Sequence, residues 1–141
     1  EVTLLGTMRS YDQSWREAMY EKIEQGSKAI CAVYDTECEL VTKKGFPAVR
    51  NNSALTKMLR ETSIGLFGKE RTLEFEPKMW AEDFGYFSQA LPSVFWYIGV
   101  KPHDLPEMPP IHNAKFNPSE EALPIGCAML VAGAMDFLNK E

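Results

Sequence analysis

The order of apolar and polar residues predicts a β-α-β unit at the start of the chain. Residues 2–8 form a short apolar run that is typical of a strand. An amphipathic pattern follows, which predicts a helix over residues 13–25 that stops at Gly26. From residue 28 to residue 42, apolar and polar positions alternate, which predicts a long, half-buried strand. Such a unit is too small to close a core of its own and needs further strands beside it.

The rest of the chain predicts a second unit in which helices and strands alternate. The expected elements are a helix capped at residues 51–53, a strand at 72–75, a short helix at 82–90, a strand at 93–100 and a final helix at 119–139. The run at 93–100 is almost continuously apolar, as in a strand that is covered on both faces. Residues 43–47 resemble a crossing between domains. The pattern therefore predicts an α/β protein.

The last predicted helix is apolar enough to raise the question of a membrane span. It is short for a span, contains Pro124 and Asp136, and begins at Ser119 with the cap of a water-soluble helix. We therefore expect a buried helix that covers a sheet, and no contact with a membrane.

Composition and charge limit the possible functions. The chain has 141 residues, the length of one ordinary domain, and its 45% hydrophobic and 25% charged residues are typical of a globular protein. Its net charge of −5 argues against a nucleic-acid partner, because such proteins carry a basic surface.

The three cysteines point to no special chemistry. Cys31, Cys38 and Cys127 form no C-x-x-C motif, so neither a disulfide framework nor a thiolate zinc site is indicated. We expect them to be small buried hydrophobic residues. This usage suits a reducing compartment, and we expect a cytoplasmic location.

His112 is the first candidate for chemistry. It follows the apolar run at 93–100 in the block P-P-I-H-N-A-K-F, and open α/β sheets place ligands where strands end. The flanking prolines restrict the loop and favour a preorganised metal ligand. Taken alone, however, a loop histidine is more often a solvated polar residue than a metal ligand.

Glu82, Asp83 and Arg9 are the other candidates. The two carboxylates open a predicted helix, where they would be stabilised by the helix dipole whether or not they take part in chemistry. Arg9 ends the first predicted strand and can bind a carboxylate through two hydrogen bonds. That carboxylate could belong to a substrate or to the protein itself.

The order of these blocks carries more information than any one of them. G-T-M-R-S-Y-D at residues 6–12, M-W-A-E-D-F at 79–84 and I-H-N-A-K-F at 111–116 follow one another along nearly the whole chain. This series resembles the metal-dependent amidohydrolases of the aminoacylase and carboxypeptidase superfamily. The most similar branch contains hippurate hydrolases, N-acyl-amino-acid deacylases and indoleacetyl-amino-acid hydrolases.

The resemblance implies a domain organisation. Residues 1–44 would be the second half of an α+β lid that dimerises, and residues 45–141 the C-terminal part of a two-metal α/β catalytic domain. We therefore expect a homodimer formed through the lid, and a chain that belongs to a longer protein.

The resemblance also implies a reaction. Family members hydrolyse N-acyl amino acids or small peptides, with a metal-bridged water as nucleophile and a glutamate as general base. A pair of Zn, Mn or Ni ions is the implied cofactor. By this resemblance His112 is a metal ligand and Arg9 binds the carboxylate of the substrate. Glu82 and Asp83 would organise the loops of the active site without holding metal.

One departure from the family pattern limits what the isolated chain can do. The blocks that carry the other metal ligands and the general base do not occur in these residues, and no catalytic residue is expected among them. A catalytic zinc site needs three or more protein ligands, so we expect the isolated chain to be inactive. The alternative interpretation is a truncated, non-catalytic remnant or a dimerisation module.

Overall fold

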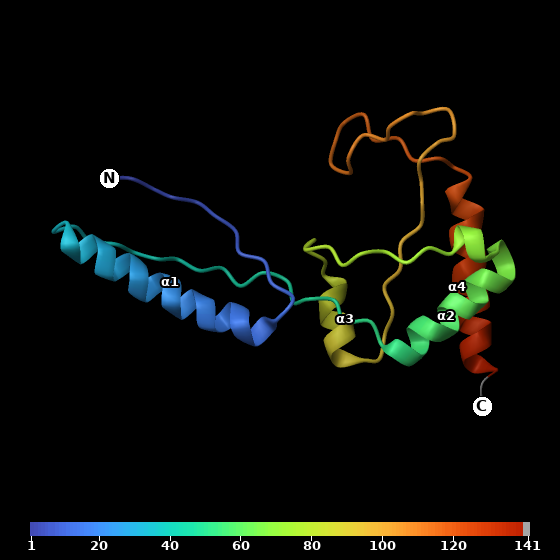
Figure 1. The fold of residues 1–141 in the computed structure, drawn as a ribbon, viewed down its shortest axis with the longest axis horizontal. Coiled ribbons are helices and arrows are strands. Elements are labelled where there is room, and N and C mark those ends of the chain that lie inside the picture. The colour runs from blue at the N-terminus through green and yellow to red at the C-terminus, as the bar shows by residue number, and fades with distance from the viewer. Residues whose placement is uncertain (140–141) are drawn as a thin grey trace. The chain divides into compact units, whose positions relative to one another are not determined.

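The computed structural model describes residues 1–139, and helices are the regular secondary structure of this range (Figure 1). The elements are α1 (Gln13–Val33), α2 (Ser53–Phe67), the short 3-10 helix η1 (Lys69–Arg71), α3 (Phe84–Ala90) and α4 (Ala122–Leu138). Long segments without regular secondary structure connect them.

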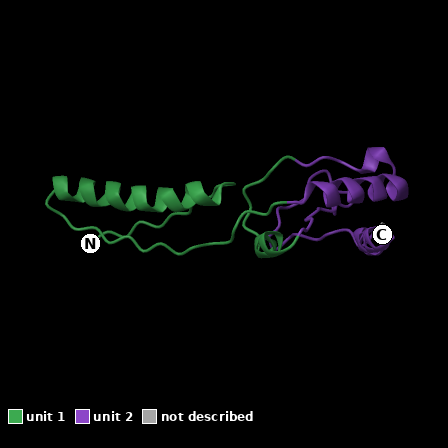
Figure 2. Ribbon diagram, turned by 90° about the horizontal axis from the view of Figure 1, so that it is seen from below, with its two compact units in different colours: residues 1–50, 76–91 green, residues 51–75, 92–141 purple. Residues whose placement is uncertain are grey.

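The chain divides into two compact units (Figure 2). Unit 1 contains residues 1–50 and 76–91, with α1 and α3, whereas unit 2 contains residues 51–75 and the chain from residue 92 onward. The expected division at residues 44 and 45 into lid and catalytic domain stays a prediction.

The expected α/β fold class is wrong for the described structure. Residues 1–139 contain no β-strand, so neither the sheet of a catalytic domain nor the strands of an α+β lid are present there. The segments at 2–8, 72–75 and 93–100 have no regular secondary structure. A strand requires ladder hydrogen bonds to a neighbouring strand, and an apolar pattern alone does not provide that partner.

Helix α1 begins where the sequence predicts and ends later. The Asp12 carboxylate caps it by accepting a hydrogen bond from the Trp15 N–H (3.0 Å). The helix continues through Gly26 to Val33, so the helical prediction for residues 13–25 was too short and the strand prediction for 28–42 was wrong. Glycine inside a helix costs only about 1 kcal/mol relative to alanine, too little to end this one.

The end of α1 is a tight turn that reverses the chain. The Thr36 N–H donates to the Cys31 carbonyl (3.0 Å) and the Asp35 N–H donates to the Ala32 carbonyl (3.4 Å). Asp35 has φ +53°, the left-handed conformation that such a C-terminal cap needs and that glycine usually supplies. The chain then runs back beside α1, as Figure 1 shows.

A buried arginine anchors unit 1. Arg16 is only 7% exposed, and its guanidinium donates to the Phe46 carbonyl (2.8 Å) and to the side chain of Gln13. The next residue, Pro47, is buried, and its carbonyl packs so closely on Gly85 of α3 that no side chain would fit there. The segment predicted as an interdomain crossing is therefore held against both helices of unit 1.

Unit 2 is built on the packing of α2 against α4. Met58 of α2 and Met129 of α4 are buried, and Gly133 of α4 lies directly against the side chain of Leu59. The absence of a side chain at Gly133 lets the two helices approach closely. Within residues 1–139, no helix is long and apolar enough to cross a membrane.

Candidate functional site

The structure places His112 in a tight turn of unit 2. The Asn113 N–H donates to the Pro110 carbonyl (3.1 Å), and the side chain of Asn113 accepts from the Lys115 N–H (2.8 Å). His112 lies between these groups with φ +75°, a conformation that residues other than glycine rarely adopt. Its side chain is exposed, so the turn presents an accessible imidazole.

The described residues do not form a complete metal site. Within residues 1–139, no three His, Cys, Asp or Glu side chains come together where they could share a metal ion. The other histidine, His103, is exposed and pairs with Glu121, with 3.7 Å between Nε2 and Oε2. An exposed imidazole can serve as one ligand, but a catalytic site needs at least three. His112 therefore fits only as part of a larger ligand set.

Arg9 lies against the backbone of Met79 in unit 1. Its Nη1 donates to the Met79 carbonyl (2.6 Å), three residues before Glu82. Among residues 1–139, its exposed guanidinium forms no ion pair with a carboxylate. A guanidinium carries five N–H donors, so the contact with Met79 leaves donors for a further acceptor.

Glu82 and Asp83 stand at the start of α3. The half-buried Glu82 accepts a hydrogen bond from the Phe84 N–H (3.4 Å), which places its negative charge at the positive end of a helix. Asp83 is exposed and makes no capping hydrogen bond with its side chain. The structure thus joins Arg9 to Met79, three residues before Glu82, in unit 1, whereas His112 belongs to unit 2.

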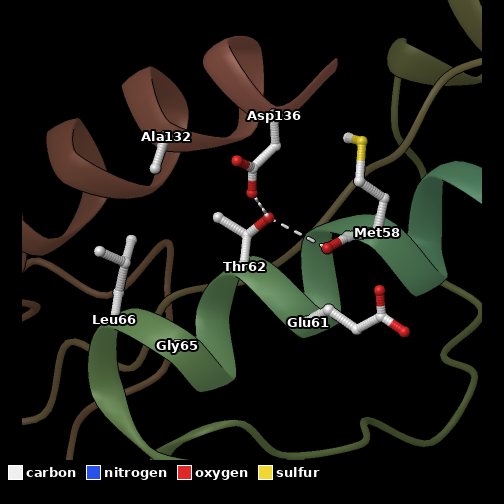
Figure 3. A pocket seen from close by; sticks show the side chains of 7 residues that line it. All are labelled: Met58, Glu61, Thr62, Gly65, Leu66, Ala132 and Asp136. Carbon is white, nitrogen blue, oxygen red and sulfur yellow. Dashed lines mark hydrogen bonds between the residues drawn. The ribbon is translucent and has the colours of Figure 1, made fainter. Parts of the chain in front are cut away.

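A groove of about 460 Å³ lies between α2 and α4 (Figure 3). Its lining residues are Met58, Glu61, Thr62, Gly65, Leu66, Ala132 and Asp136. The Thr62 hydroxyl lies within hydrogen-bond reach of both the Asp136 carboxylate and the Met58 carbonyl, and its single hydrogen donates to one of them at a time. None of the candidate residues from the sequence lines this groove, which we regard as part of the packing of unit 2.

Two residues with a clear structural role escaped the sequence interpretation. The Asn51 side chain donates to the Phe95 carbonyl (2.9 Å) and accepts from the Phe95 N–H (2.8 Å), so it pairs with this backbone as a neighbouring strand would. Arg16 is the second, and its signal was present in the sequence. It lies three and seven residues before Met19 and Ile23, which makes it a charged residue on the apolar face of α1.

The sequence matches the profile of peptidase family M20/M25/M40 over residues 9–136, which is more than half of the chain. The chain therefore belongs to the peptidase family M20/M25/M40. The resemblance drawn from the ordered blocks is confirmed at this level.

Curated relatives agree with this assignment. The chain is 32% identical over 134 residues to the amidohydrolase YhaA of Bacillus subtilis (strain 168). This aligned region covers 95% of this chain and 34% of the relative. It is 26% identical over 147 residues to IAA-amino acid hydrolase ILR1-like 6 of Arabidopsis thaliana, covering 98% and 31%. It is 32% identical over 139 residues to N-acetyldiaminopimelate deacetylase of Streptococcus pneumoniae (strain Taiwan19F-14), covering 98% and 34%.

The chain spans about a third of the length of these curated relatives. No solved structure matches it.

Proposed function

We propose that the native protein carrying this chain is a metal-dependent amidohydrolase that cleaves N-acyl amino acids or small peptides. Membership of peptidase family M20/M25/M40 over residues 9–136 carries this proposal, because that range includes all four candidate residues. The names of two relatives support the substrate class: one specifies an amino-acid conjugate and the other an N-acetyl group on diaminopimelate.

We assign His112 to the metal site as one ligand. Its turn, closed by the hydrogen bond between Asn113 and Pro110, holds an exposed imidazole without a competing partner among residues 1–139. Zn, Mn and Ni ions all accept imidazole ligands, and such an ion supplies Lewis-acid chemistry when bound. The remaining ligands and the general base belong, in this proposal, to other parts of the native protein.

We assign Arg9 to the carboxylate of the substrate. Its contact with the Met79 carbonyl fixes one edge of the guanidinium and leaves other N–H groups able to bind a carboxylate in two-point geometry. Glu82 and Asp83 are positioning residues in this proposal. Glu82 stabilises the first turn of α3 and thereby holds the backbone that leads back to Met79.

Chelation tests the proposed activity. The native full-length protein should hydrolyse N-acyl amino acids, lose this activity with a chelator, and regain it with Zn, Mn or Ni. Substrates in which the amide is replaced by an ether should stay intact. Hydrolysis at the same rate in the presence of the chelator would contradict metal dependence, and a folded, metal-loaded protein without activity would favour the non-catalytic alternative.

Arg9→Ala tests the substrate contact. A charge-assisted hydrogen bond contributes about 1.5–3 kcal/mol, so kcat/KM for a substrate with a free carboxylate should fall roughly 10- to 100-fold. The same substrate with its carboxylate converted to an amide should lose little. Arg9→Lys is the matched control that keeps the charge and removes the two-point geometry. An equal loss on both substrates would remove Arg9 from carboxylate binding.

We also propose that the native protein is a cytoplasmic homodimer formed through residues 1–44. Trp15, Ile23 and Ile30 are 44–64% exposed on α1, and burial of such side chains favours association. The mass in solution tests the dimer: Trp15→Glu should shift it towards the monomer, and an unchanged mass would place the interface elsewhere.

A further inference from the structure

Two cysteines meet at the end of α1. Cys31 lies in the last turn of the helix, and Cys38 lies on the segment that returns beside it. The side chains of Cys38 and Cys31 lie near enough to interact, and both residues are half-buried within unit 1. Neither residue belongs to the site proposed above.

The tight turn after α1 produces this meeting. Both the N–H and the hydroxyl of Thr36 donate to the Cys31 carbonyl (3.0 and 3.1 Å), which fixes the returning chain two residues before Cys38. In the expected strand at 28–42, these cysteines would lie on opposite faces and roughly 23 Å apart. The pair exists only because the helix continues to Val33 and the chain then reverses.

We propose that Cys31 and Cys38 form a reversible intramolecular disulfide, which makes this turn a redox-sensitive modification site. The oxidant is a low-molecular-weight disulfide of the glutathione type. One cysteine thiolate attacks it, its S–S bond breaks, and one glutathione leaves as a thiolate that takes up a proton. The second cysteine then attacks the mixed disulfide and releases a second glutathione. Two protein thiols are oxidised and one glutathione disulfide is reduced.

The surroundings indicate which thiol reacts first. Burial raises the pKa of the Cys38 thiol, and the neighbouring Cys31 thiol raises it further. The Lys28 ammonium, one turn before Cys31 on α1, acts in the opposite direction but less strongly. A raised pKa lowers the thiolate fraction, so Cys38 is suited to the second, resolving step. In this proposal Cys31 is the thiol that attacks the glutathione disulfide.

Cys127 provides an internal control. It is exposed and lies in α4 of unit 2, whereas the other two cysteines pair in unit 1. At a given glutathione redox ratio, Cys127 should form a mixed disulfide with glutathione, while Cys31 and Cys38 should form a protein disulfide.

Peptide mapping of the native protein tests the proposal directly. After equilibration with reduced and oxidised glutathione, free thiols are alkylated at low pH. Trypsin cuts after Lys28 and Lys43, so both cysteines occur in one peptide, residues 29–43. We expect this peptide to be unalkylated and about 2 Da lighter than its reduced form. A second cut after Glu37 should give two pieces that separate only on reduction.

Variants and unfolding complete the test. With Cys38→Ser, Cys31 should carry a glutathione adduct, and with Cys31→Ser, Cys38 should acquire its adduct more slowly. Unfolding in urea should reduce the preference for the protein disulfide on the order of tenfold, because the fold sets the effective concentration of the thiols. Separate glutathione adducts on both cysteines of the native wild-type protein, or the same preference in urea, would overturn the proposal.

Discussion

Helix α1 of unit 1 and helix α4 of unit 2 have similar lengths and are stabilised by different interactions. The buried residue of α1 is a charged one, Arg16, and several of its apolar side chains are exposed. Helix α4 buries Ala122, Met129 and Gly133, and packs against α2. Unit 1 depends on hydrogen bonds near the ends of a helix, whereas unit 2 depends on an apolar contact between two helices.

This difference determines where each unit is vulnerable. Removing buried apolar volume should weaken unit 2 and leave unit 1 almost unchanged. Removing the hydrogen-bond donor of Arg16 should weaken unit 1 and leave unit 2 almost unchanged. Hydrogen exchange of the native protein distinguishes these effects, because it reports the opening of each helix separately.

The largest effect is expected for Met129→Ala, which removes buried volume from unit 2. Met129 is 5% exposed, and such a truncation costs about 2–4 kcal/mol. Amides of α2 and α4 should exchange faster and those of α1 should not. Met135→Ala on the same helix is the control, since Met135 is 57% exposed and should be nearly neutral. Equal acceleration in α1 would show that the units do not open separately.

Arg16→Met should have the corresponding effect on unit 1. The variant keeps an unbranched aliphatic stem and leaves the Phe46 carbonyl without its donor, which costs about 1–3 kcal/mol. Amides of α1 should exchange faster. Lys22→Met, at an exposed position of the same helix, should leave exchange unchanged. Similar exchange in the two variants would argue against the anchoring role of Arg16.

Replacing two glycines by alanine should change the stability of the two units in opposite directions. A side chain at Gly85 of α3 would meet the carbonyl of Pro47, which is backbone and cannot move aside, so Gly85→Ala should cost about 1–3 kcal/mol. Gly65 of α2 has nothing within 4 Å of that position. Gly65→Ala should therefore stabilise unit 2 by about 0.5–1 kcal/mol through helix propensity. Chemical denaturation of both variants shows whether the free energy of unfolding falls or rises.

The smallest expected effect is a difference in pH dependence between the caps of α1 and α2. Hydrogen bonds from the Ser14 hydroxyl and the Trp15 N–H hold the pKa of Asp12 below its ordinary value. The contribution of Asp12 to stability is therefore complete above the unfolded pKa and is lost as pH falls through the lowered one. The cap of α2, Asn52, does not titrate.

Stability measured against pH should thus differ between the two cap variants. Asn52→Ala should destabilise by about 1 kcal/mol at every pH, whereas Asp12→Ala should destabilise at neutral pH and lose its effect in strong acid. The same pH profile for both variants would contradict a charged cap on α1.

The sequence predicts helices well where a local cap defines them. Asp12 and Asn52 lie directly before α1 and α2, and the predicted final helix at 119–139 agrees with α4 apart from its first turn. The end of α1 was missed because Gly26 resembled a stop signal. The actual stop uses Asp35 in a conformation that a sequence pattern does not mark for aspartate.

The strand predictions failed for a different reason. Apolar alternation indicates which residues suit a sheet, but a sheet also needs neighbouring strands, and these depend on residues far away in the sequence. The backbone of Phe95 pairs instead with the side chain of Asn51, a contact between distant positions that periodicity does not reveal.

For the candidate residues, too, the sequence predicts some properties and misses others. The ordered blocks predicted the family, which is confirmed, and the roles of the candidate residues stay predictions. The contacts that surround these residues could not be predicted from the sequence. The contact of Arg9 with Met79 and the cysteine pair at the end of α1 both join segments whose approach depends on tertiary structure.

The proposed metal site is tested most directly by the metal content of the native protein with His112→Ala, measured together with its rate on an N-acyl amino acid. His103→Ala is the matched control, because His103 is an exposed histidine of unit 2 that we place outside the metal site. We expect His112→Ala to lose both metal and activity, and His103→Ala to keep both. Wild-type metal content and rate in His112→Ala would show that His112 is not a metal ligand.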